Sequence, residues 1–452
     1  MAIVALCYAS PMPSPALSWL SCIGCGATAP LYGTLKFTCP KCGGLYDVEH
    51  DFSAIKKEGV DALRKIFDGR TLQSADDVCS RSGVWRFKEL VMPSLANEEI
   101  VSLGEGVIPM WRAGSNLREW VGGDLDLWMM PEGLTPTGSF KDFGGTVAIS
   151  VAKASGVKAI ACASTGDTSA MAAAYAAAAG MQCAVVLPKG QVTDVQLAQP
   201  VAHGAKVVLI PGSFDECMRV VRELVDAGRV FPINSINPTR IEGHQASVFL
   251  ANQFFGWQIP EAFVVPVGNG SNSSSIGKGM RLLRDLGFTD RLAMLIGVQS
   301  DAANPLATSW ETTQKDGYAD PKAWLESYKP RADLGETSAT AARIGAPVSY
   351  QKVMREIDAS RGAVLTALER DLNEAVMVAG RDGHLVCPQT GTALAGLRQA
   401  VERGFVKPGA RVVVISTATG LKFPGVATSQ AASSLTETAS CDTEEVAMAI
   451  GV

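Results

Sequence analysis

Histidine is scarce in this chain, and only His50, His203, His244 and His384 occur among its 452 residues. Histidine is the usual general base near neutral pH and the commonest metal ligand in proteins. The scarcity excludes a histidine-rich metal site and leaves few candidates for a serine–histidine–aspartate hydrolase. If the chain is an enzyme, we expect its acid–base chemistry to rest on another group.

Long apolar runs and early basic residues are also missing. No apolar stretch approaches the roughly 20 residues of a membrane-spanning helix. The first basic residue is Lys36, so no basic region precedes a signal-type or transit-type segment. The eleven cysteines are odd in number and mostly stand singly, as Cys162 and Cys183 do, which is typical of reduced thiols. These features predict a cytoplasmic protein with no membrane partner.

An excess of basic charge is absent as well. The chain has 40 Lys and Arg against 45 Asp and Glu, a formal net charge of −5. A chain with this balance has no general attraction to phosphate backbones, so we expect no nucleic-acid partner. Its length suffices for two or three domains at roughly 150 residues each.

Short apolar segments alternate with helical segments from about residue 126 to residue 425. Continuous apolar runs are typical of parallel strands covered on both faces. We predict such strands at residues 159–164, 183–188, 205–212, 262–268, 293–299 and 410–416. The helices between them include residues 168–180, which are almost all alanine. The alternation predicts an α/β fold with two parallel-sheet domains.

Changes in composition divide the chain into four regions. Residues 1–50 combine a proline-containing leader with a segment that resembles a zinc ribbon. Residues 51–125 form a linking region, and residues 126–425 form the main α/β region, whose smaller subdomain covers about residues 150–235. Residues 426–452 form a tail rich in Ser, Thr and Ala, with a short helix expected after Asp442.

Two cysteine pairs have the spacing of a metal site. Thirteen residues separate the pair Cys22 and Cys25 from the pair Cys39 and Cys42, and a glycine follows each pair. Four thiolates suit a tetrahedral zinc ion with no open position, so we predict a structural rather than a catalytic zinc. The alternatives are a metal-free remnant of a zinc ribbon and a redox role.

Lys141 lies in the first turn of a helix expected to open at Ser139, after a strand at residues 127–130 and a turn that contains Gly133, Pro136 and Gly138. A cation at this position meets the positive end of the helix dipole, which lowers the pKa of the amine. A lowered pKa is what Schiff-base formation by a lysine needs. The alternative is an ordinary solvated lysine.

Two further strands end in loops that suit anions. Residues 164–169 read STGDTS and residues 268–274 read GNGSNSS, and each loop opens a helix. Free backbone amides and small hydroxyls at a helix N-terminus bind carboxylates and phosphates. A poised lysine together with two anion-binding loops favours a pyridoxal-phosphate enzyme that acts on an amino acid.

Six motifs occur in the order seen in threonine synthases of pyridoxal-phosphate fold type II, and the chain resembles that family over roughly residues 20–425. The motifs are PTGSFKD, STGDTSA, NSINPTRIEG, VGNGSN, CPQTGTAL and STATGLKFP. The segments TCPKCGGLYDVEHD and GVWRFKEL are similar to the plant-like branch. The resemblance implies a tryptophan synthase β-like fold and a homodimer.

The same resemblance implies an activity. O-phospho-L-homoserine and water would give L-threonine and phosphate by γ-elimination followed by β-addition. A serine/threonine dehydratase or a cysteate synthase acting on phosphoserine is the alternative with the same fold and cofactor. A zinc-ribbon binding protein with a degenerate enzyme core is disfavoured, because Lys141 is intact and the chain is acidic.

The resemblance also implies a role for each matching residue. Lys141 would carry the cofactor and act as general base and acid. The other cofactor contacts would be Asp167 at the 3-hydroxyl, Thr417 at the pyridine nitrogen and, at the phosphate, Gly268, Asn269, Gly270, Ser271 and Asn272. The substrate contacts would be Ser164 and Thr165 at the carboxylate and Thr168, Asn234, Ser235 and Arg240 at the phosphate.

Three positions depart from the common family pattern. Asp167 replaces a frequent asparagine, as in the plant-like branch, Ser271 varies the phosphate loop, and Thr419 stands where a histidine is common. Purely structural roles remain open for several of the matching residues. Arg240 could pair with Glu242 at the surface or simply occupy a helix start, Asn234 and Ser235 could be capping and turn residues, and Thr417 could be a plain strand-end hydroxyl.

Overall fold

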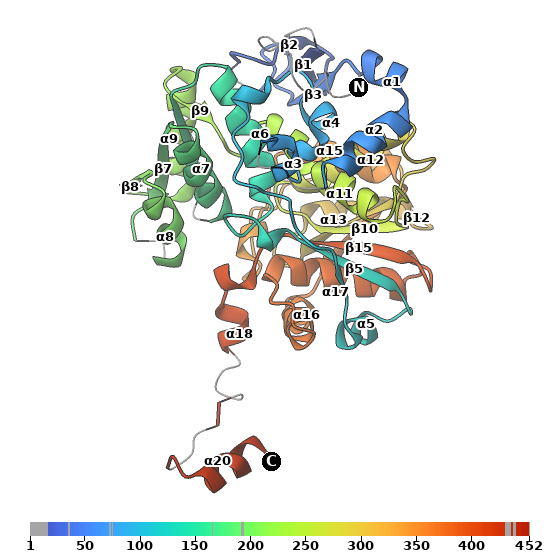
Figure 1. Cartoon of the computed structure of the whole chain (residues 1–452). Helices are drawn as coiled ribbons and strands as arrows, with labels where there is room; N and C mark the ends of the chain where they lie inside the picture. The colour runs from blue at the N-terminus through green and yellow to red at the C-terminus, as the bar shows by residue number, and fades with distance from the viewer. Residues whose placement is uncertain are drawn as a thin grey trace.

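The apolar segments predicted as strands form two parallel sheets in the computed structural model (Figure 1). A small antiparallel sheet precedes them near the N-terminal end, and a short hairpin, β12 (Gln314–Lys315) and β13 (Tyr318–Ala319), follows later. The structure describes residues 17–34, 37–71, 74, 76–164, 166–190, 194–429, 435–436 and 440–451.

The larger sheet has six strands in the order β14–β11–β10–β15–β5–β4. All neighbouring strands are parallel except the pair β4 and β5. Every residue of the central strand β10 is buried, because helices cover both faces of the sheet. The strands are β4 (Trp111–Arg112), β5 (Asp126–Pro131), β10 (Ala262–Pro266), β11 (Met294–Ser300), β14 (Ala363–Ala367) and β15 (Arg411–Ser416).

Two layers of helices enclose this sheet (Figure 1). One layer consists of α5 (Ser115–Val121), α16 (Glu369–Arg381) and α17 (Pro388–Glu402). The opposite layer consists of α10 (Thr239–His244), α11 (Ala246–Phe254) and α12 (Ser271–Asp285). Further helices pack around the β14 end, namely α13 (Pro305–Thr313), α14 (Pro321–Ser327) and α15 (Tyr350–Ala359).

The smaller sheet has four parallel strands in the order β8–β7–β6–β9. They are β6 (Ala159–Ala163), β7 (Gln182–Pro188), β8 (Lys206–Ile210) and β9 (Phe231–Pro232). The helices beside them are α7 (Asp167–Ala178), α8 (Asp194–Ala202) and α9 (Phe214–Asp226). Helix α6 (Lys141–Ala154) contacts both α7 and α10 and so joins the two parts.

Glycines allow α6 to approach its neighbours closely. A Cβ at Gly145 would collide with Met171 on α7, and a Cβ at Gly243 on α10 would collide with the carbonyl of Phe143. The first residue of α6 is therefore fixed relative to both sheets.

The N-terminal antiparallel sheet, order β2–β1–β3, carries the cysteine pairs. Its strands are β1 (Ser18–Cys22), β2 (Thr28–Pro30) and β3 (Tyr46–His50), and we call residues 17–50 the ribbon. The linking region after the ribbon is mostly helical. It holds α1 (Ser53–Glu58), α2 (Val60–Gly69), α3 (Val78–Arg81) and α4 (Lys88–Val91), and the short 3-10 turns η3 (Trp85–Phe87) and η4 (Asn97–Glu99).

The six predicted strands are all present, with ends within about two residues of the predicted ones. Strand β14 is not predicted by the pattern, because its sequence AVLTA is short and interrupted by Thr366. The predicted tail helix is confirmed as α20 (Thr443–Ile450), whose first amides bond to the Asp442 carboxylate. The leader is predicted to cover the first 18 residues; residues 1–16 lie outside the described residues, and Ser18 already begins β1.

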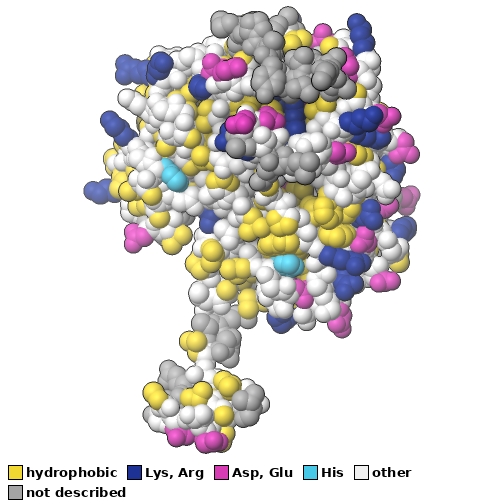
Figure 2. Space-filling view, in the orientation of Figure 1, with side chains coloured by type: hydrophobic (Ala, Val, Ile, Leu, Met, Phe, Trp, Pro, Cys, Tyr) yellow, Lys and Arg dark blue, Asp and Glu magenta, His cyan; other side chains and the backbone are white. Residues whose placement is uncertain are grey.

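The tail helix α20 and the preceding α18 (Gly425–Ser429) lead away from the body in Figure 1. Figure 2 shows hydrophobic side chains on the surface of this end of the chain, where Met448 and Ile450 are largely exposed. Among the residues that the structure describes, no helix combines the length and apolar character needed to cross a membrane.

Candidate functional site

The loops singled out in the sequence meet at one edge of the two sheets. The lysine loop (residues 131–140) follows β5, the phosphate loop (residues 267–270) follows β10, and residues 417–422 follow β15. The loop at residues 164–166 follows β6 of the smaller sheet. In open α/β sheets, ligands bind at the carboxyl ends of parallel strands, so this edge is the candidate site.

Lys141 is the first residue of α6 and is half-buried, with its Nζ atom 3.7 Å from the centre of the Phe140 ring. Burial, and after it the nearby cation of Arg240, lower the pKa of this amine to about 7. Burial, rather than the helix dipole that the sequence suggested, is therefore the main cause. A neutral amine is available near neutral pH for attack on an aldehyde carbon.

Hydrogen bonds hold the lysine loop rigidly in front of α6. The Asp142 carboxylate accepts a bond of 2.7 Å from the Thr137 amide and a second one from the Thr137 hydroxyl. The Thr135 hydroxyl donates to the Ser139 carbonyl, and the Phe140 amide donates to the carbonyl of Thr417 at 2.8 Å. These bonds fix the position of Lys141 relative to β15.

The phosphate loop has the shape of an anion cradle. Gly270 is left-handed with φ of 85°, and a Cβ there would lie 2.6 Å from the Val353 side chain, so glycine is required. Helix α12 starts at Ser271, and its first amides have no acceptor within the helix. The Asn272 side chain is buried, and both of its polar atoms have no hydrogen-bond partner among the described residues. This loop fits a phosphate group.

Arg240 is the most strongly buried cation of the site, with an exposed fraction of 1%. Its Nη1 donates to the Ile233 carbonyl at 3.1 Å, whereas Nε and Nη2 find no partner in the described part of the chain. Burial lowers its pKa to about 10, which leaves it charged near neutral pH. The alternative of a surface pair with Glu242 is wrong, because Glu242 is itself buried and bonds to Lys278 and His50.

The other predicted substrate residues surround the end of β6. The side-chain amide nitrogen of Asn234 donates to the Ala163 carbonyl at 3.0 Å, and the buried Oδ1 of the same side chain has no partner among the described residues. The Ser164 hydroxyl accepts a bond from the Gly166 amide at 3.3 Å. Thr168 and Ser235 are half-buried. Thr165 lies outside the described residues.

Thr417 is buried directly after β15, as the sequence suggested for a partner of a cofactor ring. Its hydroxyl lies 3.5 Å from the sulfur of Cys387, and its amide donates to the Thr390 hydroxyl at 3.1 Å. Cys387 and Thr390 both belong to the CPQTGTAL motif, so this motif packs behind the site.

The structure adds three ionisable residues that the sequence reasoning missed. Burial raises the pKa of Glu132 to about 8, and its carboxyl group bonds to the Ser247 hydroxyl. Burial and the neighbouring Arg240 hold the pKa of His244 well below its usual range, which keeps its ring neutral against Phe140. Lys422 forms an ion pair with Asp167. The signal in the sequence was their place: Glu132 lies in the lysine loop, Lys422 lies in the STATGLKFP motif, and His244 directly follows the NSINPTRIEG motif.

The four ribbon cysteines converge as predicted. Their sulfur atoms all lie within 4.8 Å of one another, with 3.4 Å between Cys22 and Cys42 and 3.7 Å between Cys25 and Cys39. Sulfur atoms around a tetrahedral zinc ion lie about 3.8 Å apart, given Zn–S bonds of about 2.3 Å. The donor set and its spacing therefore fit a zinc ion.

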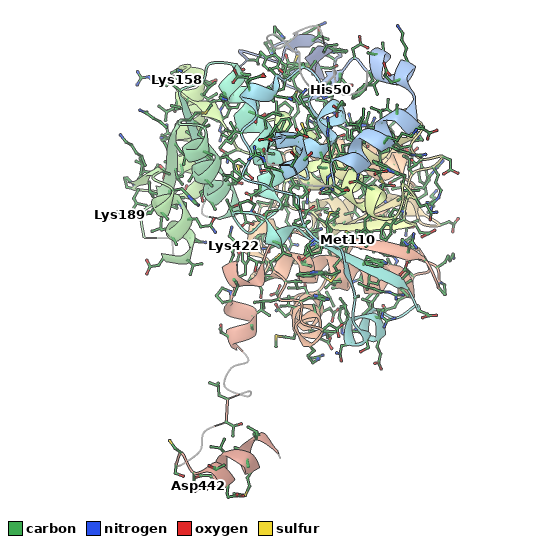
Figure 3. All side chains as sticks on the ribbon, viewed as in Figure 1. His50, Met110, Lys158, Lys189, Lys422 and Asp442 are labelled. Carbon is green, nitrogen blue, oxygen red and sulfur yellow. The ribbon has the colours of Figure 1, made fainter. Side chains whose placement is uncertain are left out.

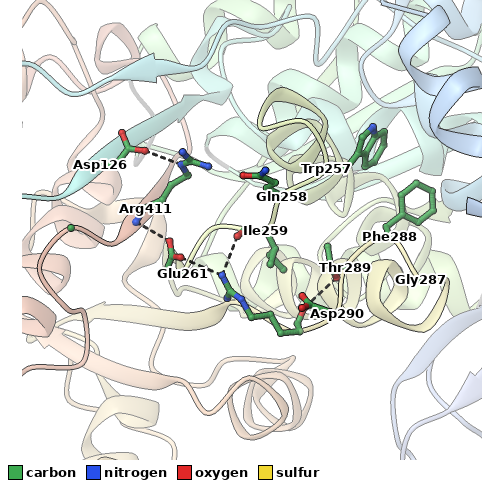
Figure 4. Close-up of a pocket in the computed structure, with 12 residues that line it drawn as sticks. Asp126, Trp257, Gln258, Ile259, Glu261, Gly287, Phe288, Thr289, Asp290 and Arg411 are labelled. Atoms are coloured by element: carbon green, nitrogen blue, oxygen red, sulfur yellow. Dashed lines mark hydrogen bonds and ion pairs between the residues drawn. The ribbon is translucent and has the colours of Figure 1, made fainter. Parts of the chain in front are cut away.

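A separate cavity of about 860 Å³ lies at the opposite, amino-terminal edge of the larger sheet (Figure 4). Four of its charged groups bond to one another: Arg411 bonds to Asp126 at 2.8 Å, and Glu261 accepts from the Arg411 amide and from Arg291. Because these charges are mutually satisfied and lie at the far ends of the strands from Lys141, this cavity is not the candidate active site.

Comparison with known proteins agrees with this geometry. A family model described as "Pyridoxal-phosphate dependent enzyme" matches residues 101–418. The chain therefore belongs to the pyridoxal-phosphate-dependent enzymes of α/β fold.

Similarity to individual proteins identifies the family within this class of enzymes. Threonine synthase of Methanocaldococcus jannaschii is 36% identical over 90% of this chain and 93% of its own length. The chloroplastic threonine synthase 2 of Arabidopsis thaliana is 36% identical over 84% of this chain and 72% of its own length. The chain belongs to the threonine synthase family. A crystal structure of threonine synthase from Escherichia coli has the same fold, with a TM-score of 0.66 at 18% identity over 95% of this chain and 94% of that one.

Proposed function

We propose that this protein converts O-phospho-L-homoserine and water to L-threonine and phosphate with pyridoxal phosphate as its cofactor. One observation carries the proposal: Lys141, whose pKa is lowered, lies at the same edge of the sheets as buried Arg240 and the glycine cradle at Gly270. Arg240 and the cradle both have hydrogen-bond donors without acceptors among the described residues. Bound pyridoxal phosphate would supply an electron sink for the charge left when a proton leaves the α-carbon.

The cofactor residues divide the work by position. Residues Gly268, Asn269, Gly270, Ser271 and Asn272 would hold the cofactor phosphate through the cradle at the start of α12. Asp167 and Thr417 would flank the ring, from α7 of the smaller part and from the end of β15. Lys141 would bind the cofactor covalently and then take the proton from the substrate α-carbon, since a pKa of about 7 leaves about half of its amine neutral near pH 7.

The substrate residues lie on the side of the smaller sheet. Arg240 would bind the substrate phosphate through its two free nitrogen positions, with help from Thr168, Asn234 and Ser235. Ser164 and Thr165 would bind the carboxylate at the end of β6. A phosphate that satisfied Arg240 would also replace the water lost when the guanidinium is buried.

The decisive experiment measures products from matched substrates. Purified protein loaded with pyridoxal phosphate should release phosphate and form threonine from O-phosphohomoserine in equal amounts. Phosphoserine and threonine are tested in parallel. Turnover of phosphoserine alone would assign a synthase that uses phosphoserine, and turnover of threonine alone would assign a dehydratase.

The converging sulfur atoms of the ribbon support the proposal of a structural zinc ion held by Cys22, Cys25, Cys39 and Cys42. Native mass spectrometry should find one zinc per chain, lost in the Cys39→Ser variant. Wild-type protein that carries no metal after expression in zinc-supplemented medium would contradict the assignment.

Family membership also supports a homodimer in the cytoplasm, and light scattering of the purified protein tests the oligomeric state. The two sheets support a catalytic region at residues 126–425 with its smaller subdomain at about 150–235, because the four-stranded sheet uses strands from residue 159 to residue 232.

A further inference from the structure

Lys422 reaches from one part of the molecule to the other across the lysine loop. It ends the turn η7 (Gly420–Lys422), which follows β15 of the larger sheet. Its Nζ atom lies 2.6 Å from the carboxylate of Asp167, the first residue of α7 beside the smaller sheet. The Lys422 label in Figure 3 stands between the green helices of the smaller part and the red C-terminal segment.

The path of this side chain is built into the lysine loop. The Lys422 ammonium also donates to the Thr137 carbonyl at 3.0 Å, and Gln199 from α8 donates to the same oxygen at 3.1 Å. Gly138 has φ of 82°, and a Cβ there would lie 3.3 Å from the Lys422 side chain. The glycine of the PTGSFKD motif therefore leaves room for Lys422 to pass.

The ion pair is largely shielded from water, with exposed fractions of 16% for the Lys422 side chain and 7% for the Asp167 side chain. The other charged and titratable groups that interact with it or with Lys141 are Arg240, Glu132, His244 and Cys387. Neither these four nor Lys141 forms an ion pair with Asp167 in the described part of the chain. Lys422 is thus the cation that faces the Asp167 carboxylate directly.

We propose that Lys422 is a positioning residue for the cofactor: it fixes Asp167 against the pyridoxal ring and balances its charge across the boundary between the two sheets. The inference rests on the proposed function, in which Asp167 meets the ring hydroxyl. A buried carboxylate without a partner is strongly disfavoured, whereas the neutral asparagine common in the family would need no cation. The aspartate at this position therefore depends on Lys422.

The test is a double-mutant cycle read out by cofactor binding rather than by turnover. Lys422→Met keeps the length of the side chain and removes its charge. In the Asp167 background we expect the dissociation constant for pyridoxal phosphate to rise about tenfold or more and the visible absorption bands of the bound cofactor to change in ratio. In the Asp167→Asn background the same change should alter the constant by less than about twofold.

Conservative and remote variants complete the design. Lys422→Arg should recover most of the affinity and the wild-type spectrum, since it restores the cation. Lys322→Met, at an 85% exposed side chain on α14, should match the wild type. Thermal melts of each apo-protein report whether the variants fold.

Equal losses of affinity in both backgrounds, or an unchanged spectrum in the Lys422→Met protein, would overturn the proposal. Wild-type protein that binds no pyridoxal phosphate would instead reject the proposed function. The two failures are therefore distinguishable.

Discussion

Two regions of the molecule differ in how completely their buried charged groups are paired. At the seam between the ribbon and the body, each buried acid has a basic partner: Asp47 pairs with Lys352 and Arg355, and Glu242 pairs with Lys278. In the candidate site, Arg240 keeps two nitrogen atoms without partners among the described residues. Buried polar groups are normally satisfied, so the seam is a finished structural contact and the site is prepared for a ligand.

The seam holds the same helices that form the site. Strand β3 contacts both α15 and α12. Lys352 of α15 pairs with Asp47, and Lys278 of α12 donates to the Val48 carbonyl. Glu242 stands two residues after Arg240 on α10. Burial opposes ionisation of Asp47, yet the cations of Lys352, Lys278 and Arg355 hold its pKa well below the usual range. Paired charges thus position the helices, and unpaired groups on those helices would bind the ligands.

The largest effect is expected for Lys141→Ala. Threonine formation should fall by about a thousandfold or more, because the variant loses both the covalent link to the cofactor and the general base. Borohydride treatment followed by peptide mass spectrometry should find reduced cofactor on Lys141 in the wild type and on no lysine of the variant. A variant that still yields a reducible adduct would refute the assignment.

Arg240→Met should separate binding from stability. We expect kcat/KM for the phosphorylated substrate to fall about a hundredfold, since a buried phosphate ligand is lost. The free energy of unfolding of the apo-protein should stay equal or rise, because a buried cation with free donors is removed. Urea denaturation and steady-state kinetics measure both quantities. Arg219→Met, at a 58% exposed side chain, is the matched control and should change neither.

Asp47→Ala should show the reverse pattern at the seam. Removing one partner of a buried ion pair leaves Lys352 and Arg355 facing each other, which should lower the free energy of unfolding by about 3 kcal/mol. Asp61→Ala, at an 84% exposed side chain, should lower it by less than about 0.5 kcal/mol. An Asp47 variant as stable as wild type would remove the distinction between the two regions.

A further prediction concerns the dependence of stability on pH. Because the folded state lowers the pKa of Lys141 from 10.5 to about 7, the unfolded chain binds more protons between these values. Lys141 therefore destabilises the apo-protein at pH 7, and this penalty shrinks as the pH rises toward 10. Lys141→Met should be more stable than wild type at pH 7, with a smaller difference at pH 9.5, measured by urea denaturation. A difference that grows with pH would contradict this reading.

Local sequence patterns predicted most of the fold. The parallel strands and the cysteine cluster follow from continuous apolar runs and fixed spacings, which depend on neighbours in sequence. The pairing of Lys422 with Asp167 and the burial of Glu132 depend on segments that meet only after folding, so no local pattern contains them. For the same reason the lowered pKa of Lys141 was expected for the wrong cause, a helix dipole rather than burial.

The ribbon's position has a practical consequence for anyone who shortens this chain. A form that begins at α1 would lose the Asp47 carboxylate and the backbone carbonyls of Tyr46 and Val48, to which Lys352 and Lys278 donate. The Lys352 ammonium would then be buried without either of these partners, whereas Lys278 would keep its ion pair with Glu242. A minimal catalytic fragment must therefore keep the ribbon or replace Lys352 with an apolar residue, because the ribbon neutralises a buried charge of the catalytic region.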